Sequence, residues 1–327
     1  MPLLDVRDLS IELQTHRGPS RAVREASFTL ERGETLGLVG ESGCGKSITA
    51  MALMGLLPEN ARVSGSIRLD GRELVGLGER AYAALRGDRI GMIFQEPMTA
   101  LNPVHTVGRQ VAEPLRLHRG MPVGEARAEA IRLLERVGIP DAARRVDSYP
   151  HQFSGGQRQR VTIAMALACG PDLLLADEPT TALDVTIQKQ ILELLRDLVA
   201  ERGMAMILIS HDLGVIAQNV RRMMVMYGGS VVESGPTAGV FTRRSHPYTL
   251  GLFGARPALS AERGQKLVTI PGTVPELADL PPGCPFAGRC PYTIAECHRI
   301  APPPVEVGPS HQARCIRLDA VHAGESP

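Results

Sequence analysis

The sequence lacks a long hydrophobic run. Its longest apolar stretches are Ile48 to Leu57 and Val161 to Cys169, which are shorter than the roughly 18 residues that a membrane-spanning helix requires. The first residues, MPLLDVRDLSIEL, place acidic groups early and no basic segment before an apolar block, which is unlike a secretory signal. We therefore expect a chain that does not cross a membrane itself and that works in the cytoplasm, where structural disulfides are rare.

The sequence also lacks an excess of charge of either sign. The formal net charge is +1, with 22% charged and 43% hydrophobic residues, an ordinary balance for a globular protein. Because no global field attracts nucleic acid or anionic lipid, we expect no nucleic-acid partner and look for local sites instead. Lysine is scarce, since Lys46, Lys189 and Lys266 stand alone among many arginines, and this makes Lys46 conspicuous.

The length of 327 residues favours either one large α/β domain with an appended piece or two modest domains. From Leu3 to about Gly235, short apolar segments alternate with helix-compatible segments, a pattern typical of a mostly parallel sheet covered by helices. The predicted strands are Thr35 to Val39, Ile90 to Phe94, Leu173 to Ala176 and Met204 to Ser210.

Two stretches depart from this alternation. Between about residues 98 and 157 no strand is predicted, and amphipathic stretches such as Val123 to Val137 indicate a helical insertion. Beyond Gly235, proline and glycine become dense, as in Ile270 to Pro285, and regular periodicity is lost. We predict a first domain over residues 1–235 and an extension over 236–327 that needs a cross-link to become ordered.

The segment GESGCGKS follows a predicted strand and precedes the helix-compatible ITAMALMGLL. Its glycines let backbone N–H groups surround a phosphate, Lys46 reaches the terminal phosphates, and Ser47 can ligate Mg²⁺. The alternative, a glycine-rich turn without a ligand, does not account for strand, loop and helix in this order. The predicted nucleotide contacts are Gly40, Glu41, Ser42, Gly43, Cys44, Gly45, Lys46 and Ser47.

Two adjacent carboxylates end another predicted strand, in the segment DLLLADEP. Asp177 is placed to hold Mg²⁺, usually through water, and Glu178 is a candidate general base for the attacking water. The alternative is a pair of exposed turn acids after a core strand. The phosphate loop in the same chain favours the catalytic interpretation.

The segment FSGGQRQR, Phe153 to Arg160, lies about 20 residues before the carboxylates and resembles the signature motif of ABC ATPases. The resemblance implies an α/β P-loop NTPase fold, an ABC-type nucleotide-binding domain with a helical subdomain insertion. In the same family pattern, Gln95 resembles the glutamine that follows the second core strand, Asp184 the aspartate of the D-loop, and His211 the switch histidine.

The family implies that two such domains close head to tail around two ATP molecules. Each chain then contributes half of each site, and the opposing subunit supplies the signature residues and Asp184. Catalysis is assigned to Glu178 with His211 and Gln95, and Mg²⁺ to Ser47, Gln95 and Asp177. The signature residues expected to act across the dimer are Ser154, Gly155, Gly156 and Gln157.

One departure from the family is the adenine contact. The family stacks adenine on an aromatic residue of the N-terminal hairpin, but Gln14 to Val23 contains none. His16 is the best substitute, and Arg21 is possible.

The branch of the family is indicated by FQEPMTALNP, SHPYT and GCPFAGRCPYTIAEC, which resemble the oligopeptide and dipeptide importers, a branch that also contains nickel importers. The resemblance implies two membrane-spanning permeases, a second ATPase subunit that is similar or identical, and an extracytoplasmic binding protein. It places the chain at the cytoplasmic face of the bacterial inner membrane. Nickel or another small solute remains an alternative cargo. A soluble ABC ATPase of DNA repair or translation would need a coiled-coil insertion or tandem cassettes, which are not present.

Four of the six cysteines, Cys284, Cys290, Cys297 and Cys315, cluster in the extension, which argues for a metal in a reducing compartment. Their spacing, C-x5-C-x6-C-x17-C, differs from paired zinc knuckles, and four thiolates can bind either a [4Fe–4S] cluster or zinc. The family resemblance implies the cluster, with zinc, or free or disulfide-linked thiols, as alternatives. Cys44 and Cys169 are interpreted as structural, and the extension is expected to lie far from the phosphate loop.

Overall fold

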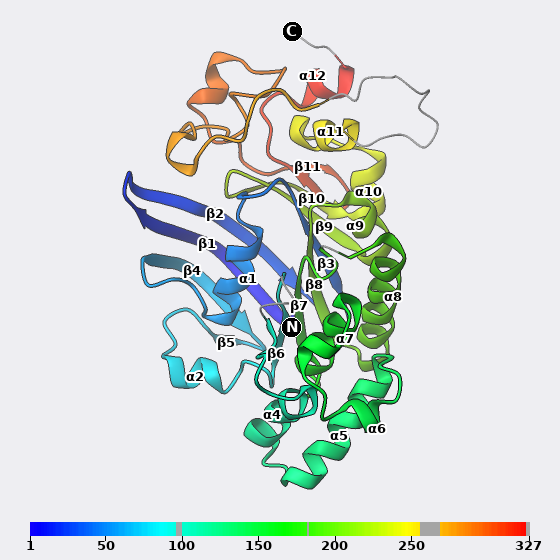
Figure 1. Cartoon of the computed structure of the whole chain (residues 1–327). Coiled ribbons are helices and arrows are strands. Elements are labelled where there is room, and N and C mark those ends of the chain that lie inside the picture. The colour runs from blue at the N-terminus through cyan, green and yellow to red at the C-terminus, as the bar shows by residue number, and fades with distance from the viewer. Residues whose placement is uncertain (96–99, 182, 256–268, 325–327) are drawn as a thin grey trace. The chain divides into compact units, whose positions relative to one another are not determined.

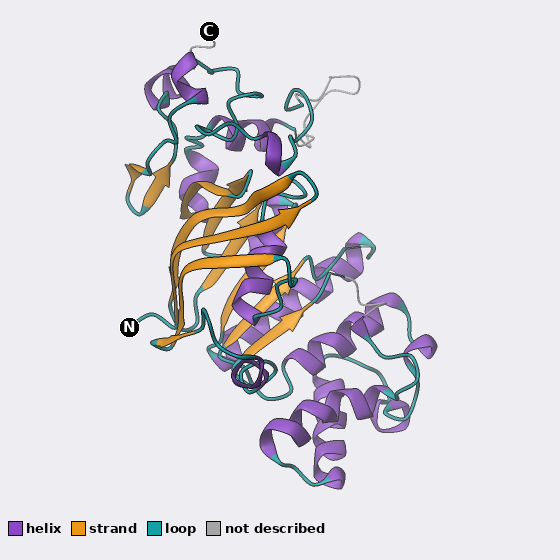
Figure 2. Ribbon diagram, turned by 90° about the vertical axis from the view of Figure 1, so that its left-hand side faces the viewer, coloured by secondary structure: helices purple, strands orange, loops and turns teal. Residues whose placement is uncertain are grey.

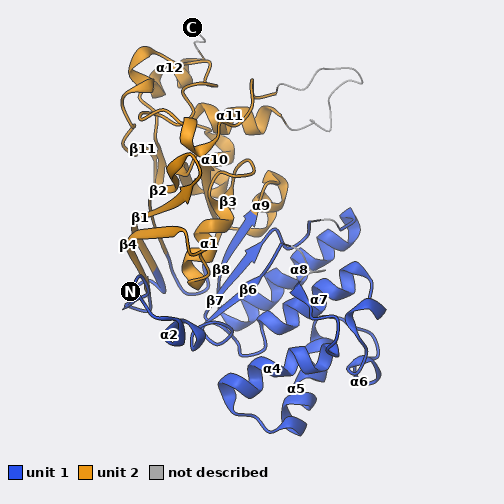
Figure 3. Ribbon diagram, turned by 60° about the vertical axis from the view of Figure 1, so that its left-hand side comes forward, with its two compact units in different colours: residues 1–4, 30–35, 69–209 blue, residues 5–29, 36–68, 210–327 orange. Residues whose placement is uncertain are grey.

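A computed structural model describes residues 1–95, 100–181, 183–255 and 269–324. The chain forms two compact units, each assembled from separate segments (Figure 3). Unit 1 contains residues 1–4, 30–35 and 69–209, and unit 2 contains residues 5–29, 36–68 and 210–327.

Unit 1 is built on three parallel strands, β6 (Ile90–Ile93), β7 (Leu173–Asp177) and β8 (Ala205–Ser210). Every residue of β7 and β8 is buried, as expected for parallel strands covered on both faces. Contiguous apolar runs had predicted all three strands to within one residue, and the structure confirms them. A two-residue strand, β5 (Arg72–Glu73), also belongs to this unit.

Helices are the main other elements of unit 1, and the segment from residue 100 to 166 contains helices and loops only (Figures 1 and 2). In α4 and α5, which pack together, the buried residues recur at helical spacing, as in Val107, Val111 and Leu115. The predicted helical region is confirmed from residue 100 onward, whereas Met98, near which it was expected to begin, lies outside the described residues. The elements are α2 (Glu79–Ala83), α4 (Val107–Arg119), α5 (Val123–Arg136), α6 (Ala142–Arg145), η1 (Pro150–Gln152), α7 (Gly155–Ala166) and α8 (Val185–Arg202).

Unit 2 contains a sheet that the sequence pattern did not predict. Strand β1 (Leu4–Thr15) lies between β2 (Gly18–Leu30) and β4 (Ala61–Leu69), and a two-residue turn joins β1 to β2. A connection this short makes a hairpin. The expectation of a mostly parallel sheet from the N-terminus onward is therefore wrong for this region, where apolar residues alternate on half-buried strands.

A second sheet of unit 2 pairs β3 (Thr35–Val39) in parallel with β9 (Arg222–Tyr227). Strand β10 (Ser230–Pro236) runs antiparallel to β9 and to β12 (His311–Ala313), which in turn pairs with β11 (Val305–Gly308). The extension thus adds strands to the edge of a sheet, although no periodicity beyond Gly235 predicted them. The helices are α1 (Lys46–Met54), α9 (Leu213–Asn219), α10 (Thr237–Thr242), α11 (Pro247–Gly254), η2 (Leu277–Asp279), η3 (Ala295–His298) and α12 (Leu318–Ala323).

The extension packs against residues of β9 and β10. The Phe286 ring packs against Tyr227 and Tyr248, with ring centroids 5.0 and 5.4 Å apart, and all three side chains are at most 2% exposed. The buried Glu233 carboxylate of β10 lies 2.8 Å from the ring of His311. Aromatic packing and a buried polar pair therefore contribute to ordering this segment. Across the described ranges, no helix is long and apolar enough to cross a membrane.

Candidate functional site

The phosphate loop of unit 2 connects β3 to α1, and its backbone requires glycine at two positions. A Cβ atom at Gly40 would lie 2.2 Å from the carbonyl oxygen of Met226. Gly45, the residue before the first turn of α1, has a φ of 107°, and a Cβ there would lie 2.7 Å from the carbonyl oxygen of Ala22. The loop therefore delivers the chain into the start of a helix, where free N–H groups favour an anion.

Lys46 is the first residue of α1, and its side chain reaches back into this loop. Its side chain is buried, and Nζ donates hydrogen bonds to the carbonyl oxygens of Gly40 at 2.8 Å and Glu41 at 2.9 Å. Nζ also lies 3.6 Å from the buried sulfur of Cys44, whose pKa is raised by burial. The loop thus holds one ammonium group among backbone groups, which is the charge arrangement that phosphate binding needs.

Two further contacts to the loop come from the C-terminal part of unit 2. The hydroxyl of Tyr248 accepts a hydrogen bond from the Glu41 N–H at 2.8 Å, and Arg289 forms an ion pair with the Glu41 carboxylate, also at 2.8 Å. The expectation that the extension lies far from the phosphate loop is wrong. Neither residue was among the predicted site residues, because nothing local in the sequence signals contacts of this range.

Glu178 follows β7 in unit 1 with a φ of 45°, a left-handed conformation that is rare for a residue with a side chain. Its N–H donates to the carbonyl oxygen of Ile209 at 3.0 Å. Its Oε2 accepts hydrogen bonds from Gln95 at 3.2 Å and from the Thr181 hydroxyl at 2.9 Å. The structure therefore brings together two predicted site residues, Gln95 and Glu178. Asp177, directly before Glu178, is the buried last residue of β7.

The signature residues begin α7 in unit 1. The Ser154 hydroxyl accepts the N–H of Gln157 at 3.4 Å, and the Gln157 side chain accepts the N–H of Ser154 at 3.2 Å, which forms a capping box. Ser154 and Gly155 are exposed at this helix start. At Gly156 a Cβ atom would lie 2.8 Å from Ile187 of α8, so a side chain there would push the two helices apart.

The remaining predicted residues lie at element ends. Asp184 caps α8 by accepting the N–H of Ile187 at 3.0 Å, and its neighbour Ala182 lies outside the described residues. His211 is exposed directly after β8, and His16 is exposed in the turn between β1 and β2. Glu96 to Thr99, part of the segment that indicated the family branch, also lie outside the described residues.

Four cysteines of the extension line one cavity. Cys284, Cys290, Cys297 and Cys315 are free thiols in its wall, together with His246. Burial raises the pKa of Cys284 to about 12 and that of Cys315 to about 11, so both are neutral thiols near pH 7. Cys169, expected on a helix, is instead a buried residue in the turn after α7.

His246 also lines this cavity, and its neutral ring has one N–H donor. Its Nδ1 accepts the N–H of Tyr248 at 3.1 Å, so the proton of the neutral ring is on Nε2. Nε2 is buried and has no hydrogen-bond partner among the residues that the structure describes. Burial lowers the pKa of His246 to about 4, which keeps the ring neutral.

The fit of these residues to a sulfur-ligated metal group depends on their arrangement and on their chemistry. Within residues 269–324 and the other described ranges, no set of three or more His, Cys, Asp or Glu side chains is arranged to hold a metal ion. The chemistry of the donors nevertheless suits such a group, since four thiols share one cavity and the same wall has an N–H donor that finds no partner in the described part of the chain.

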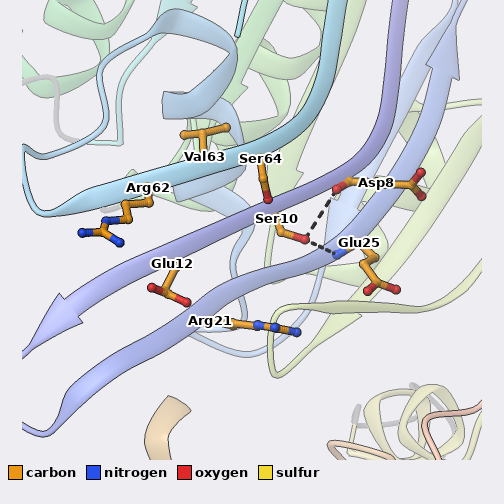
Figure 4. Close-up of a pocket in the computed structure, with 8 residues that line it drawn as sticks. All are labelled: Asp8, Ser10, Glu12, Arg21, Glu25, Arg62, Val63 and Ser64. Atoms are coloured by element: carbon orange, nitrogen blue, oxygen red, sulfur yellow. Dashed lines mark hydrogen bonds between the residues drawn. The ribbon is translucent and has the colours of Figure 1, made fainter. Parts of the chain in front are cut away.

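A larger hollow of about 600 Å³ lies over β1, β2 and β4 (Figure 4). Its wall is polar, and the Ser10 hydroxyl within it bonds to the Asp8 carbonyl at 3.4 Å and the Glu25 N–H at 3.1 Å. Among the residues proposed above to contact the nucleotide, Arg21 is the one that lines this hollow. Its lining residues are Asp8, Ser10, Glu12, Arg21, Glu25, Arg62, Val63 and Ser64.

Two protein-family models match this chain, one in the first predicted domain and one that lies mostly in the extension. A family model described as ABC transporter matches residues 23–181, and a model of the oligopeptide/dipeptide transporter C-terminal region matches residues 232–297. The oligopeptide transport ATP-binding protein OppD of Salmonella typhimurium is 51% identical over 315 residues, which cover 96% of this chain and 93% of that protein.

Solved structures agree with this result. The ATP-binding cassette MJ0796, in a dimeric post-hydrolysis state bound to ADP and Pi, matches with a TM-score of 0.64 and 29% identity over 72% of this chain and 98% of that chain. The structure of cbiO1 from Clostridium perfringens, part of the ABC transporter complex cbiONQ, matches with a TM-score of 0.63 and 28% identity over 74% of this chain and 92% of that chain.

The chain belongs to the ABC transporter ATP-binding proteins, has their P-loop NTPase cassette fold, and is an ABC-type ATPase. Within that class it belongs to the branch that carries the oligopeptide/dipeptide transporter C-terminal region. The family predicted from the SGGQ motif is therefore confirmed.

Proposed function

We propose that the chain is the ATP-hydrolysing subunit of an ABC importer that takes up dipeptides or oligopeptides across the bacterial inner membrane. The observation that carries this proposal is the 51% identity to an oligopeptide transport ATP-binding protein over 96% of this chain. The match of residues 232–297 to the C-terminal region of such transporters supports it, because a cassette alone would lack that region.

In this proposal the loop from Gly40 to Ser47 holds the phosphates of ATP. Lys46 already lies in the loop as a buried cation, and Ser47 and Asp177 are the oxygen ligands for Mg²⁺, with Gln95 close to the metal and water. A bound Mg²⁺ would neutralise charge that develops on the phosphoryl oxygens. His16 remains the proposed adenine contact.

Glu178 is the proposed general base. Its carboxylate accepts a proton from the attacking water. Gln95 donates a hydrogen bond to Oε2 of this carboxylate at 3.2 Å and so orients both the base and the water. His211 stabilises the γ-phosphate in the closed state. The left-handed backbone of Glu178 supports a functional role, because such strain is retained where a side chain must be aimed.

The catalytic unit is proposed to be a dimer of cassettes. Ser154 to Gln157 and Asp184 act on the nucleotide held by the opposing subunit, and the exposed start of α7 offers N–H groups for it. The dimeric state of the MJ0796 cassette with ADP and Pi supports this arrangement. The partners would be an identical or similar ATPase, two permeases and an extracytoplasmic binding protein, with the chain at the cytoplasmic face of the membrane.

The cysteine cavity is proposed to hold a [4Fe–4S] cluster that staples the extension, with zinc as the alternative. Cys284, Cys290, Cys297 and Cys315 would be its ligands, and Nε2 of His246 is a donor available to one of the sulfurs.

Uptake measurements test the cargo. Cells whose only peptide importer contains this chain should accumulate a labelled tripeptide, and cells carrying Lys46→Ala should not, because the ammonium in the phosphate loop is lost. Nickel accumulation under the same conditions provides the contrast. Lys46-dependent uptake of nickel without uptake of peptide would replace the proposed cargo, and uptake of neither would remove the transport proposal.

A further inference from the structure

Glu41, the second residue of the phosphate loop, is held at all three of its polar groups. Its carbonyl oxygen accepts from Lys46 at 2.9 Å, and its N–H donates to the Tyr248 hydroxyl at 2.8 Å. Its carboxylate meets two nitrogens of Arg289, at 2.8 and 3.3 Å. Two of these three groups are therefore fixed by side chains from the C-terminal part of unit 2.

Arg289 is itself fixed before it reaches the loop. Its side chain is 6% exposed, and its nitrogens also donate to the carbonyl oxygens of Pro271 at 2.8 Å and Gly272 at 3.4 Å and to the Tyr227 hydroxyl at 3.4 Å. A guanidinium stays protonated in proteins, so these contacts hold a permanent cation in one orientation.

Tyr248 is fixed by packing. Its ring lies 4.6 Å from that of Tyr227 and 5.4 Å from that of Phe286, measured between centroids, and the residue has no exposed surface. Its hydroxyl oxygen therefore has little freedom to leave the N–H of Glu41. A buried donor that loses its acceptor carries the full cost of desolvation, so this contact constrains the loop backbone.

The carboxylate of Glu41 presents an electrostatic problem for a nucleotide site. ATP brings several negative charges to the loop, and an unpaired carboxylate in the same loop would repel them. The bidentate contact with Arg289 neutralises that charge and fixes the side chain that carries it.

We propose that Arg289 and Tyr248 are positioning residues of the nucleotide site, which act through Glu41 to hold the phosphate loop in its binding conformation. The C-terminal extension therefore sets the affinity of the loop for ATP. This inference rests on the proposed function, because it assigns the loop to ATP.

Equilibrium binding of ATP to the full chain provides the test. Arg289→Gln should weaken binding about tenfold, since it leaves a partly buried carboxylate unpaired beside the phosphates. In the assembled transporter the same change should raise KM for ATP by a similar factor and leave kcat within about twofold, as expected for lost uniform binding.

Three further variants separate positioning from a merely structural role. Glu41→Gln combined with Arg289→Gln should recover affinity to within about threefold of the wild type, because the repelling charge is gone. Tyr248→Phe keeps the ring, removes the hydroxyl, and should weaken binding about threefold. Glu306→Gln, an exposed change on β11 of the extension, is the control and should bind ATP normally.

If Arg289→Gln and Tyr248→Phe both bind ATP with the affinity of the wild type, the inference is overturned and the proposed function still stands. A double variant no better than Arg289→Gln would also overturn it, since loss of structure in the extension is not repaired by a change at Glu41. If Arg289→Gln does not fold, Tyr248→Phe decides the matter. A wild-type chain that binds no ATP would remove the proposed function and this inference together.

Discussion

Glu178 shows at the scale of one residue how function and stability oppose each other. Its φ of 45° costs energy for any residue with a Cβ atom, and the side chain that imposes this cost is the proposed base. Glu178→Gly and Glu178→Ala both remove that side chain, but only glycine removes the strain.

We expect Glu178→Gly to have a free energy of unfolding about 1 kcal/mol higher than Glu178→Ala, measured by urea unfolding of the full chain. The alanine variant serves as the matched control, because it loses the same contacts with Gln95 and Thr181. A glycine variant less stable than the alanine variant would mean that the left-handed backbone carries no strain.

His246 supplies a pH dependence. Burial lowers its pKa from 6.5 to about 4. Between these two pH values the ring is therefore protonated in the unfolded chain and neutral in the folded chain. Its contribution to stability is therefore complete above pH 6.5 and is lost as the pH falls through about 4. Between these limits the wild type should lose about 2–3 kcal/mol more free energy of unfolding than His246→Asn.

Asparagine suits this test because it can also accept the N–H of Tyr248 and cap α11. Denaturant titrations at several pH values would measure the difference. Equal acid sensitivity of the two proteins would show that the ring of His246 is protonated in the folded state.

At the scale of elements, the three parallel strands β6, β7 and β8 were predictable from the sequence, and the short strands β11 and β12 were not. Strand β7 is a contiguous apolar run buried on both faces, which is a local signal. Strands β11 and β12 are only four and three residues long, and they exist because β10 offers an edge to pair with. Short strands of this kind depend on tertiary context, which one sequence does not display.

In the candidate site, too, the residues of local motifs were predictable and the long-range contacts were not. The phosphate loop, the carboxylates and the signature helix each carry a local motif, so the sequence predicted them. The pair of Glu41 and Arg289 is separated by 248 residues, and neither residue belongs to a pattern that names the other. A contact of this range follows from packing of the extension, and only the structure could reveal it.

The cysteine cavity leads to a prediction for the extension as an element. Chain purified without oxygen should be brown and contain about four irons, and Cys297→Ser should lose both the colour and the protection of the extension from proteolysis. Cys169→Ser, outside the extension, is the control and should keep the iron. Stoichiometric zinc without iron would transfer the site to zinc, and absence of both metals would remove the metal proposal.

At the scale of the whole molecule, both compact units carry parts of the proposed machinery. The phosphate loop, His211 and the extension belong to unit 2, and Gln95, Glu178 and the signature helix belong to unit 1. The proposal of half-sites adds a second copy or a similar chain, so hydrolysis should be measured on the assembled transporter rather than on the isolated chain.

The most direct test of the account is steady-state ATP hydrolysis by the purified transporter that contains Glu178→Gln. The amide keeps the size of the side chain and cannot accept the proton of the attacking water, so hydrolysis should fall about 10²–10⁴-fold, with ATP affinity unchanged. Glu193→Gln, a change on α8 at a side chain that is 45% exposed, should hydrolyse ATP like the wild type. Hydrolysis by Glu178→Gln at a rate near that of the wild type would contradict the account.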